Sequence, residues 1–237
     1  MKIKINMIGL HKQEVKNVLA KYYNQGARFN IVENYYETDV EVECDDSNSQ
    51  LFDNIVRDVH VNFSKSIYGT NEKNIYSAAF ELLKFKGYRL AIAESVTAGR
   101  LCSEFVAQNE GASKILVEGI VCYSVESKKR RLGVSEETIE KFSPQSVECS
   151  YELASGLVAT TNADVVIATT GYASNDAEDE NNGKCFIAVG DKNVIHVFKH
   201  SFKGNRNHIM QRISKTAFLH LIKKIKQNDF DLPQNVL

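Results

Sequence analysis

The stretch DVVIATT, residues 164–170, decides the fold class of this chain. Four apolar residues follow one another from Val165 to Ala168, with no polar residue between them. Such a run is typical of a strand that is buried on both faces, and these strands belong mostly to parallel sheets covered by helices. The stretch therefore predicts an α/β domain rather than an all-β one.

Strand and helix patterns alternate on both sides of this stretch. We expect further strands at residues 89–94, 118–123, 184–190 and 193–202, and helices at residues 75–85, from about 97, across 143–161 and from about 205. Ser143 followed by Pro144 is expected to start the helix before the central strand, since serine is a good cap and proline suits the first turn.

The first 71 residues read as a separate, small α+β unit. Apolar residues alternate in KIKINM (residues 2–7) and TDVEVEC (38–44), which predicts half-buried strands. They recur at helical spacing in residues 12–23 and 49–63. The pattern breaks between residues 68 and 74, so we expect one domain over residues 1–71 and a second over 72–237.

Composition and charge exclude several classes of protein. Lys and Arg number 29 against 30 Asp and Glu, a net charge of -1 that indicates no polyanionic partner. The longest apolar runs fall well short of the roughly 18 residues that a membrane helix needs, and the N-terminus lacks the pattern of a signal peptide. We therefore expect a cytoplasmic protein. The five cysteines show no C-x-x-C spacing, so reduced, buried thiols are expected.

Chemistry has to be found by elimination. The six histidines form no motif typical of a metal site, and neither a P-loop nor a G-x-S-x-G segment occurs. Ser113, Tyr123 and Lys128 remain as candidates. A neutral lysine can deprotonate a serine if its pKa is lowered, and the following Lys-Arg-Arg favours that shift. The alternative is that the KKRR run, residues 128–131, is an ordinary solvated helix face.

Several segments carry a specific resemblance. They are AESVTAG (93–99), GAS (111–113), YSVESK (123–128), LGV (132–134), TG (170–171) and GNR (204–206). In order and sequence they are similar to the deamidase domain of the CinA (competence/damage-inducible protein) family, whose members include nicotinamide mononucleotide deamidases. Longer members carry a KH-like segment that ends in Ile-Tyr-Gly, as at residues 67–69 here. The larger N-terminal domain of those proteins, similar to molybdopterin-binding proteins, is not found in this sequence.

The resemblance implies a three-layer, deamidase-like α/β domain with a central, mostly parallel sheet, preceded by a small α+β KH-like domain. It implies hydrolysis of nicotinamide mononucleotide to nicotinate mononucleotide and ammonia, without a metal or another cofactor. Ser113 would be the nucleophile, Lys128 its general base and Tyr123 an assistant that steers the lysine. The residues matched to substrate binding are Glu94, Ser95, Thr97, Thr170, Gly171 and Arg206. Family members often associate, so a homo-oligomer is expected.

The departures from the family pattern cluster at the substrate. The glycine-rich loop is replaced by GYASN (171–175) and the acidic DAEDENNG (176–183), a poor cradle for a phosphate. A substrate-shifted or inactive protein with a binding or regulatory role therefore stays open. A dinucleotide-binding domain is a weaker alternative, because the G-x-G-x-x-G spacing is missing. No G-x-x-G loop precedes Gly69, so nucleic-acid binding is not expected.

Overall fold

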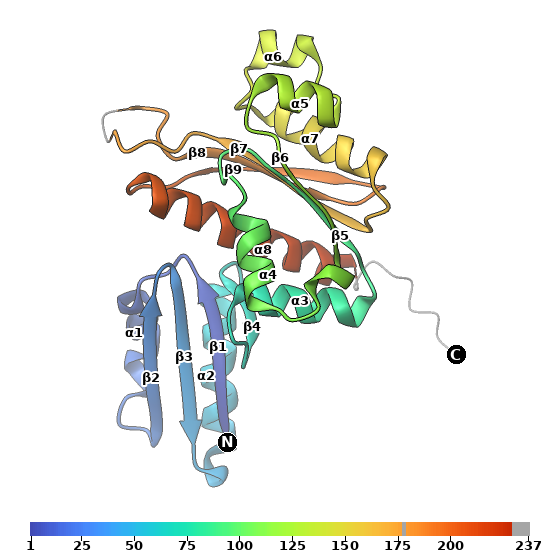
Figure 1. Ribbon diagram of the computed structural model, residues 1–237. Helices are drawn as coiled ribbons and strands as arrows, with labels where there is room; N and C mark the ends of the chain where they lie inside the picture. The colour runs from blue at the N-terminus through green and yellow to red at the C-terminus, as the bar shows by residue number, and fades with distance from the viewer. Residues whose placement is uncertain (177–178, 229–237) are drawn as a thin grey trace. The chain divides into compact units, whose positions relative to one another are not determined.

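A computed structural model describes residues 1–176 and 179–228 of the chain. Two compact units are found, Met1–Ala78 and Ala79–Leu237, and each has a sheet of its own (Figure 1). The boundary that the sequence predicts, between residues 71 and 72, lies in the turn between strand β4 (Ile67–Thr70) and helix α3 (Ile75–Lys86). None of the helices in the described ranges combines the length and the apolar character that a membrane crossing requires.

The N-terminal unit is a four-stranded antiparallel sheet with two helices on one face (Figure 1). Its elements are β1 (Lys2–Ile8), α1 (Lys12–Leu19), β2 (Ala27–Asn34), β3 (Glu37–Cys44), α2 (Ser49–Phe63) and β4, in the spatial order β2-β3-β1-β4. This β-α-β-β-α-β arrangement is that of the ferredoxin-like split βαβ fold. The expected α+β class is confirmed, while the name KH-like stays a prediction from the resemblance.

Besides the four-residue strand β4, the sequence does not predict strand β2 of this unit. Its side chains alternate between half-buried and exposed positions over the first five residues and are exposed over the last three. Strand β3, by contrast, buries every second residue, including Val40 and Val42, against α2. An edge strand with one weakly buried face carries little hydrophobic signal, which explains the difference.

The C-terminal unit contains a five-stranded sheet in the order β6-β5-β7-β8-β9. Its elements are α3, β5 (Leu90–Glu94), α4 (Arg100–Gln108), the short 3₁₀ helix η3 (Ala112–Lys114), β6 (Leu116–Val121), α5 (Val125–Leu132), α6 (Glu136–Phe142), α7 (Val147–Thr160), β7 (Val165–Gly171), β8 (Lys184–Gly190), β9 (Ile195–Ser201) and α8 (Arg206–Asn228). Strands β6, β5 and β7 are parallel, and β8 and β9 continue the sheet antiparallel.

Helices cover both faces of this sheet, which confirms the three-layer α/β class (Figure 1). On one face, α7 buries Leu153, Ala154 and Leu157 in a cluster with β5 and β7. On the other face, Phe105 of α4 stacks on Phe218 of α8 at 5.5 Å between ring centroids. The apolar stretch of residues 164–170 is the middle strand, as its burial on both faces predicts.

Helix α7 starts later than the sequence predicts. Its cap is Ser146, whose hydroxyl accepts a hydrogen bond from the N–H of Cys149 at 3.0 Å. Ser143 has a φ of +81° and ends α6 instead. A helix cap needs an extended backbone, so the expectation that Ser143 and Pro144 start this helix is wrong.

Candidate active site

The carboxyl ends of three parallel strands gather the candidate side chains. Ser95 directly follows β5, Tyr123 follows β6 after one intervening residue, and Thr170 is the second-last residue of β7. The N–H of Ser95 donates to the carbonyl of Thr169 at 3.0 Å, so the end of β5 is fixed to β7. Ligands of open α/β sheets bind at this edge, where the strands end and the loops begin.

Lys128 is the buried centre of this edge, with 1% of its surface exposed. Helix α5 turns Lys128 and Leu132, one helical turn apart, toward the sheet and leaves Arg130 and Arg131 exposed. The Lys128 Nζ is 2.8 Å from the Oγ of Ser95, 2.8 Å from the carbonyl oxygen of Cys122 and 3.3 Å from that of Tyr123. Lys128 is therefore not part of a solvated helix face.

Burial lowers the pKa of the Lys128 ammonium, because desolvation disfavours its charged form. The thiols of Cys122 and Cys149 and the phenol of Tyr123 act in the opposite direction and are weaker. The cysteines are themselves buried, and all five thiols of the chain are free. A lysine with a lowered pKa beside a serine hydroxyl is the arrangement that activates a serine nucleophile.

Ser113 lies at the other end of the sheet. It is an exposed residue of η3, the short helix that precedes β6, whereas Lys128 comes after β6. Leu116 pairs with Leu90 at the start of β5, and Val121 pairs with Glu94 at its end. The length of β6, about 17 Å at roughly 3.3 Å per residue, therefore separates Ser113 from the lysine. The predicted pairing of Ser113 with Lys128 is not made within the chain.

Tyr123 and Arg206 meet at the exposed side of the site. The guanidinium of Arg206 donates to the Tyr123 phenol oxygen at 3.0 Å and to the carbonyl of Ala173. Its backbone N–H donates to the side chain of Asn175 at 3.1 Å, which ties the start of α8 to the loop after β7. The tyrosine is 58% exposed, so its ring forms part of the wall that a substrate would meet.

Glu94 binds backbone groups of the protein itself and does not face the space where a substrate would lie. Its carboxylate accepts hydrogen bonds from the N–H groups of Gly99, Leu101 and Cys102, at 2.9 to 3.0 Å, and the residue is fully buried. These are N–H donors at the start of α4, a position where a helix terminus can otherwise hold an anion. Because the protein's own carboxylate fills this helix terminus, it does not hold the substrate.

Two predicted substrate residues are also occupied by internal contacts. Thr97 shares a 2.8 Å hydrogen bond with Thr169, and Thr170 donates to the carbonyl of Pro144 at 2.7 Å. All of these hydroxyls are buried. Gly171 follows with a φ of +150°, and a Cβ there would lie 2.5 Å from the carbonyl oxygen of Lys184. These residues therefore shape the end of β7 instead of reaching into the site.

The acidic loop after β7 is closed by its own polar side chains. The Asn182 side chain accepts from the N–H of Ser174 and donates to the carbonyl of Asp176. The Asp179 carboxylate accepts from the N–H of Asn181 at 2.9 Å. Glu178 lies outside the described residues. Side-chain hydrogen bonds have thus replaced the glycine-rich backbone as the organising element of this loop.

Sequence reasoning missed the backbone groups of the site. The carbonyls of Cys122 and Tyr123 hold the lysine. The N–H groups of Val96 and Thr97 have no hydrogen-bond partner within the part of the chain that the structure describes. The signal that could have identified them is position, since residues directly after a nucleophile at a strand end commonly supply such donors.

A family model described as the CinA C-terminal domain matches residues 72–225. The chain belongs to this family. The match covers the whole site described above, from Ser95 to Arg206.

Curated relatives and solved structures agree with this assignment. A putative competence-damage inducible protein of Bacillus cytotoxicus is 39% identical over 163 residues, which are 68% of this chain and 39% of the relative. One from Caldicellulosiruptor saccharolyticus is 33% identical over 177 residues, 74% of this chain and 43% of the relative. The chain thus spans less than half the length of these relatives. The crystal structure of a CinA superfamily protein from Klebsiella pneumoniae matches with a TM-score of 0.61 and 26% identity, covering 65% of this chain and 96% of that chain.

Proposed function

We propose that this CinA-family chain is a Ser/Lys amidohydrolase whose nucleophile is Ser95 and whose general base is Lys128. The observation that carries the proposal is the 2.8 Å contact between the Ser95 Oγ and the buried Nζ of Lys128. The substrate class is an amide, with nicotinamide mononucleotide as the candidate that the family resemblance supplies. Ser113, at the opposite end of β6, has no part in this mechanism.

The surroundings of Lys128 suit a base that works in its neutral form. A neutral amine has two N–H groups and one lone pair. The two carbonyls, of Cys122 and Tyr123, can each accept one N–H, which leaves the lone pair for the proton of Ser95. Lys128 would take that proton as Ser95 attacks the amide carbon, and would return it to the nitrogen that leaves as ammonia.

The N–H groups of Val96 and Thr97 are the candidate oxyanion donors. They directly follow Ser95 in the chain, and the described residues offer them no other acceptor. A tetrahedral intermediate on Ser95 places a negative oxygen beside the backbone that follows the nucleophile. The Glu94 carboxylate fixes this turn by holding the first N–H groups of α4.

Arg206 is the candidate for binding the anionic part of the substrate. Its guanidinium has five N–H donors, and the contacts to Tyr123 and Ala173 leave donors available. A phosphate is well matched to a guanidinium, because planar paired donors fit two of its oxygens. The acidic residues Asp176 and Asp179 on the neighbouring loop would reduce affinity for a phosphate relative to a neutral amide.

Ammonia release from nicotinamide mononucleotide tests the proposal. We expect release by the unmodified chain, loss with Ser95→Ala and full retention with the matched control Ser113→Ala. Loss with Ser113→Ala and retention with Ser95→Ala would instead restore the assignment made from the sequence.

A binding or regulatory role is the alternative that the loop of residues 171–183 favours. In that case nicotinamide mononucleotide would bind without ammonia release, and Ser95→Ala would leave its affinity unchanged. Binding measured by calorimetry beside the activity assay separates this outcome from a substrate-shifted amidase, which would release ammonia from another amide.

A further inference from the structure

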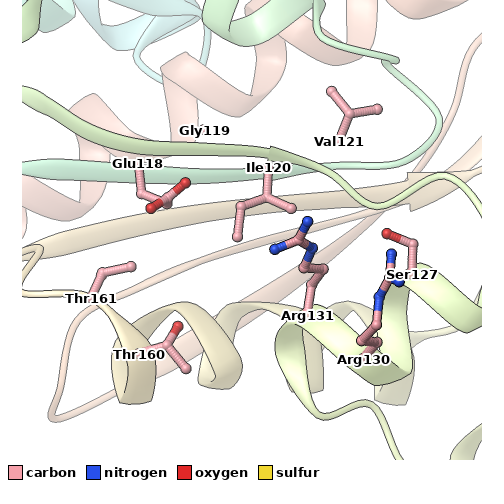
Figure 2. A pocket seen from close by; sticks show the side chains of 9 residues that line it. All are labelled: Glu118, Gly119, Ile120, Val121, Ser127, Arg130, Arg131, Thr160 and Thr161. Atoms are coloured by element: carbon pink, nitrogen blue, oxygen red, sulfur yellow. The ribbon is translucent and has the colours of Figure 1, made fainter.

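A hollow lies outside the candidate active site, at the open edge of the C-terminal sheet (Figure 2). Its volume is about 600 Å³, and it lies between edge strand β6, helix α5 and the end of helix α7. The residues that line it are Glu118, Gly119, Ile120, Val121, Ser127, Arg130, Arg131, Thr160 and Thr161. Neither Lys128 nor Ser95 takes part, so the proposed reaction does not account for this hollow.

The backbone of β6 presents unpaired groups to the hollow. Cys122, which directly follows β6, donates its N–H to the carbonyl of Glu94, so this N–H faces β5. In a parallel strand the direction alternates from one residue to the next, which turns the N–H and C=O of Val121 and Gly119 outward. Strand β6 is at the edge of the sheet, and no strand of the described chain pairs with that side.

The side chains that surround this edge are cationic at one end. Arg130 and Arg131 extend from α5 toward the hollow, with Ser127 beside Arg130 (Figure 2). No hydrogen bond or ion pair joins either guanidinium to any other described residue. Glu118 lies at the other end, near Thr161. The hydroxyls of Thr160 and Thr161 donate to carbonyls of their own helix and offer no donor to a ligand.

The combination separates two kinds of occupant. A free anion would satisfy the guanidiniums and the outward N–H groups of Gly119 and Val121, but it would leave their outward carbonyl oxygens without a donor. An extended peptide supplies N–H and C=O groups in alternation, and it can place acidic side chains against the arginines. Gly119 has no side chain because a Cβ there would lie 2.7 Å from the sulfur of Cys102, so α4 packs closely on β6 at this residue.

From these features we infer that β6 is a docking edge for an extended acidic peptide, which adds to the sheet as a sixth strand. Its acidic side chains contact Arg130 and Arg131, and its alternate, apolar side chains lie on the opposite face beside Val121. That valine is 49% exposed and lies next to Gly99 at the start of α4. The occupant is a segment of another protein, in the manner of β-strand addition.

The probe is the fluorescently labelled peptide Thr-Val-Glu-Val-Glu-Val-Thr, with binding followed by anisotropy. We expect saturable binding that weakens at least tenfold in R130Q/R131Q, because two charge-assisted contacts are lost. The double variant K199Q/K203Q removes two exposed charges at and just after β9, the opposite edge strand of the sheet, and should bind as the unmodified chain does. Thermal unfolding of both variants checks that they are folded.

The main-chain contacts are tested on the peptide, which avoids changes to the fold. N-methylation of all valines blocks one edge of the probe, and N-methylation of both glutamates blocks the other. We expect one of these peptides to lose binding and the other to keep it, and amide exchange at Gly119 and Val121 to slow when the probe binds.

Four results would overturn the inference. They are unchanged binding by R130Q/R131Q, equal binding of both methylated peptides, equally effective competition by inorganic phosphate, and protection of the β6 amides that depends on protein concentration without a peptide. Effective competition by phosphate would mean that the hollow is a simple anion site. Concentration-dependent protection without a peptide would mean that a second copy of the chain is the occupant.

Discussion

Replacing Lys128 by methionine is the most direct perturbation of the proposed mechanism. Methionine has a similar length and no charge, so it fills the space of a side chain that is 1% exposed. General-base catalysis contributes roughly 10² to 10⁴ in rate, and we expect kcat/KM to fall about a thousandfold, or about 4 kcal/mol. The matched control is Lys129→Met, one residue along α5, where the lysine pairs with Glu136 at the surface.

Stability should change far less than activity in this variant. The carbonyls of Cys122 and Tyr123 lose their donor, which costs about 1 to 3 kcal/mol for each buried group. The lysine in turn no longer has to be desolvated, which offsets most of that loss, so we expect a net change of about 1 to 2 kcal/mol in urea unfolding. Activity loss in a folded variant would then reflect chemistry.

The pH dependence gives a second test of the same residue. Activity should rise as pH increases through the lowered pKa of Lys128, because the neutral amine is the base. A lysine whose pKa is lower in the folded state costs stability below that pKa, and the cost declines as pH rises toward the unfolded value of 10.5. A variant Lys128→Met that keeps its activity, or an unmodified protein whose rate does not change between pH 6 and 10, would refute the reasoning.

Three further predictions concern neighbouring groups. Arg206→Gln should raise the KM for nicotinamide mononucleotide more than tenfold and leave that of a neutral amide nearly unchanged, which steady-state kinetics would show. Glu94→Gln should destabilise the chain by about 1 to 3 kcal/mol in urea unfolding, because a neutral amide accepts the three α4 N–H groups more weakly. Asp191 forms a 2.8 Å ion pair with Lys224, both being nearly buried, so Asp191→Asn should cost about 3 to 5 kcal/mol, against under about 1 kcal/mol for the exposed control Asp164→Asn. Burial raises the pKa of Asp191, but the Lys224 contact and the N–H groups of Asn193 and Val194 together lower it by more, so the net pKa lies below 3.8. This stability is therefore present above pH 3.8 and is lost as pH falls through the folded pKa.

The order of most elements was predictable, because it follows from periodicity, although β2, β4 and α6 were not expected. The continuous apolar run of β7 predicts burial on both faces, and the alternation in β3 predicts burial on one face, as the structure has them. Strand β2 and the start of α7 were not predictable in the same way. Strand β2 buries few side chains, so its sequence shows little alternation. The start of α7 depends on the positive φ of Ser143, whereas the Ser-Pro pair by itself is typical of a helix start.

The site was predictable in part. The resemblance indicated Lys128, Tyr123 and Arg206, and the structure brings all three to one edge of the sheet. It assigned the nucleophile to Ser113 and gave Ser95 only to substrate binding, because the distance along the chain does not tell which serine approaches a lysine. The topology decides this. Because β5 and β6 are parallel, Ser95, which follows β5, lies beside the residues that follow β6, including Lys128. Ser113 precedes β6 and therefore lies at the opposite end of these strands.

The three strands that build the site also determine when it can form. Strands β5, β6 and β7 are joined through long helical connections, whereas β8 and β9 form a local hairpin. Contacts between strands distant in sequence form slowly during folding, because loop closure is costly before they are made. Ser95 and Lys128 therefore come together only after β5 and β6 have paired, which is later than formation of the local hairpin. Recovery of activity during refolding would follow the last kinetic phase, and a collapsed intermediate that contains the hairpin alone would be inert.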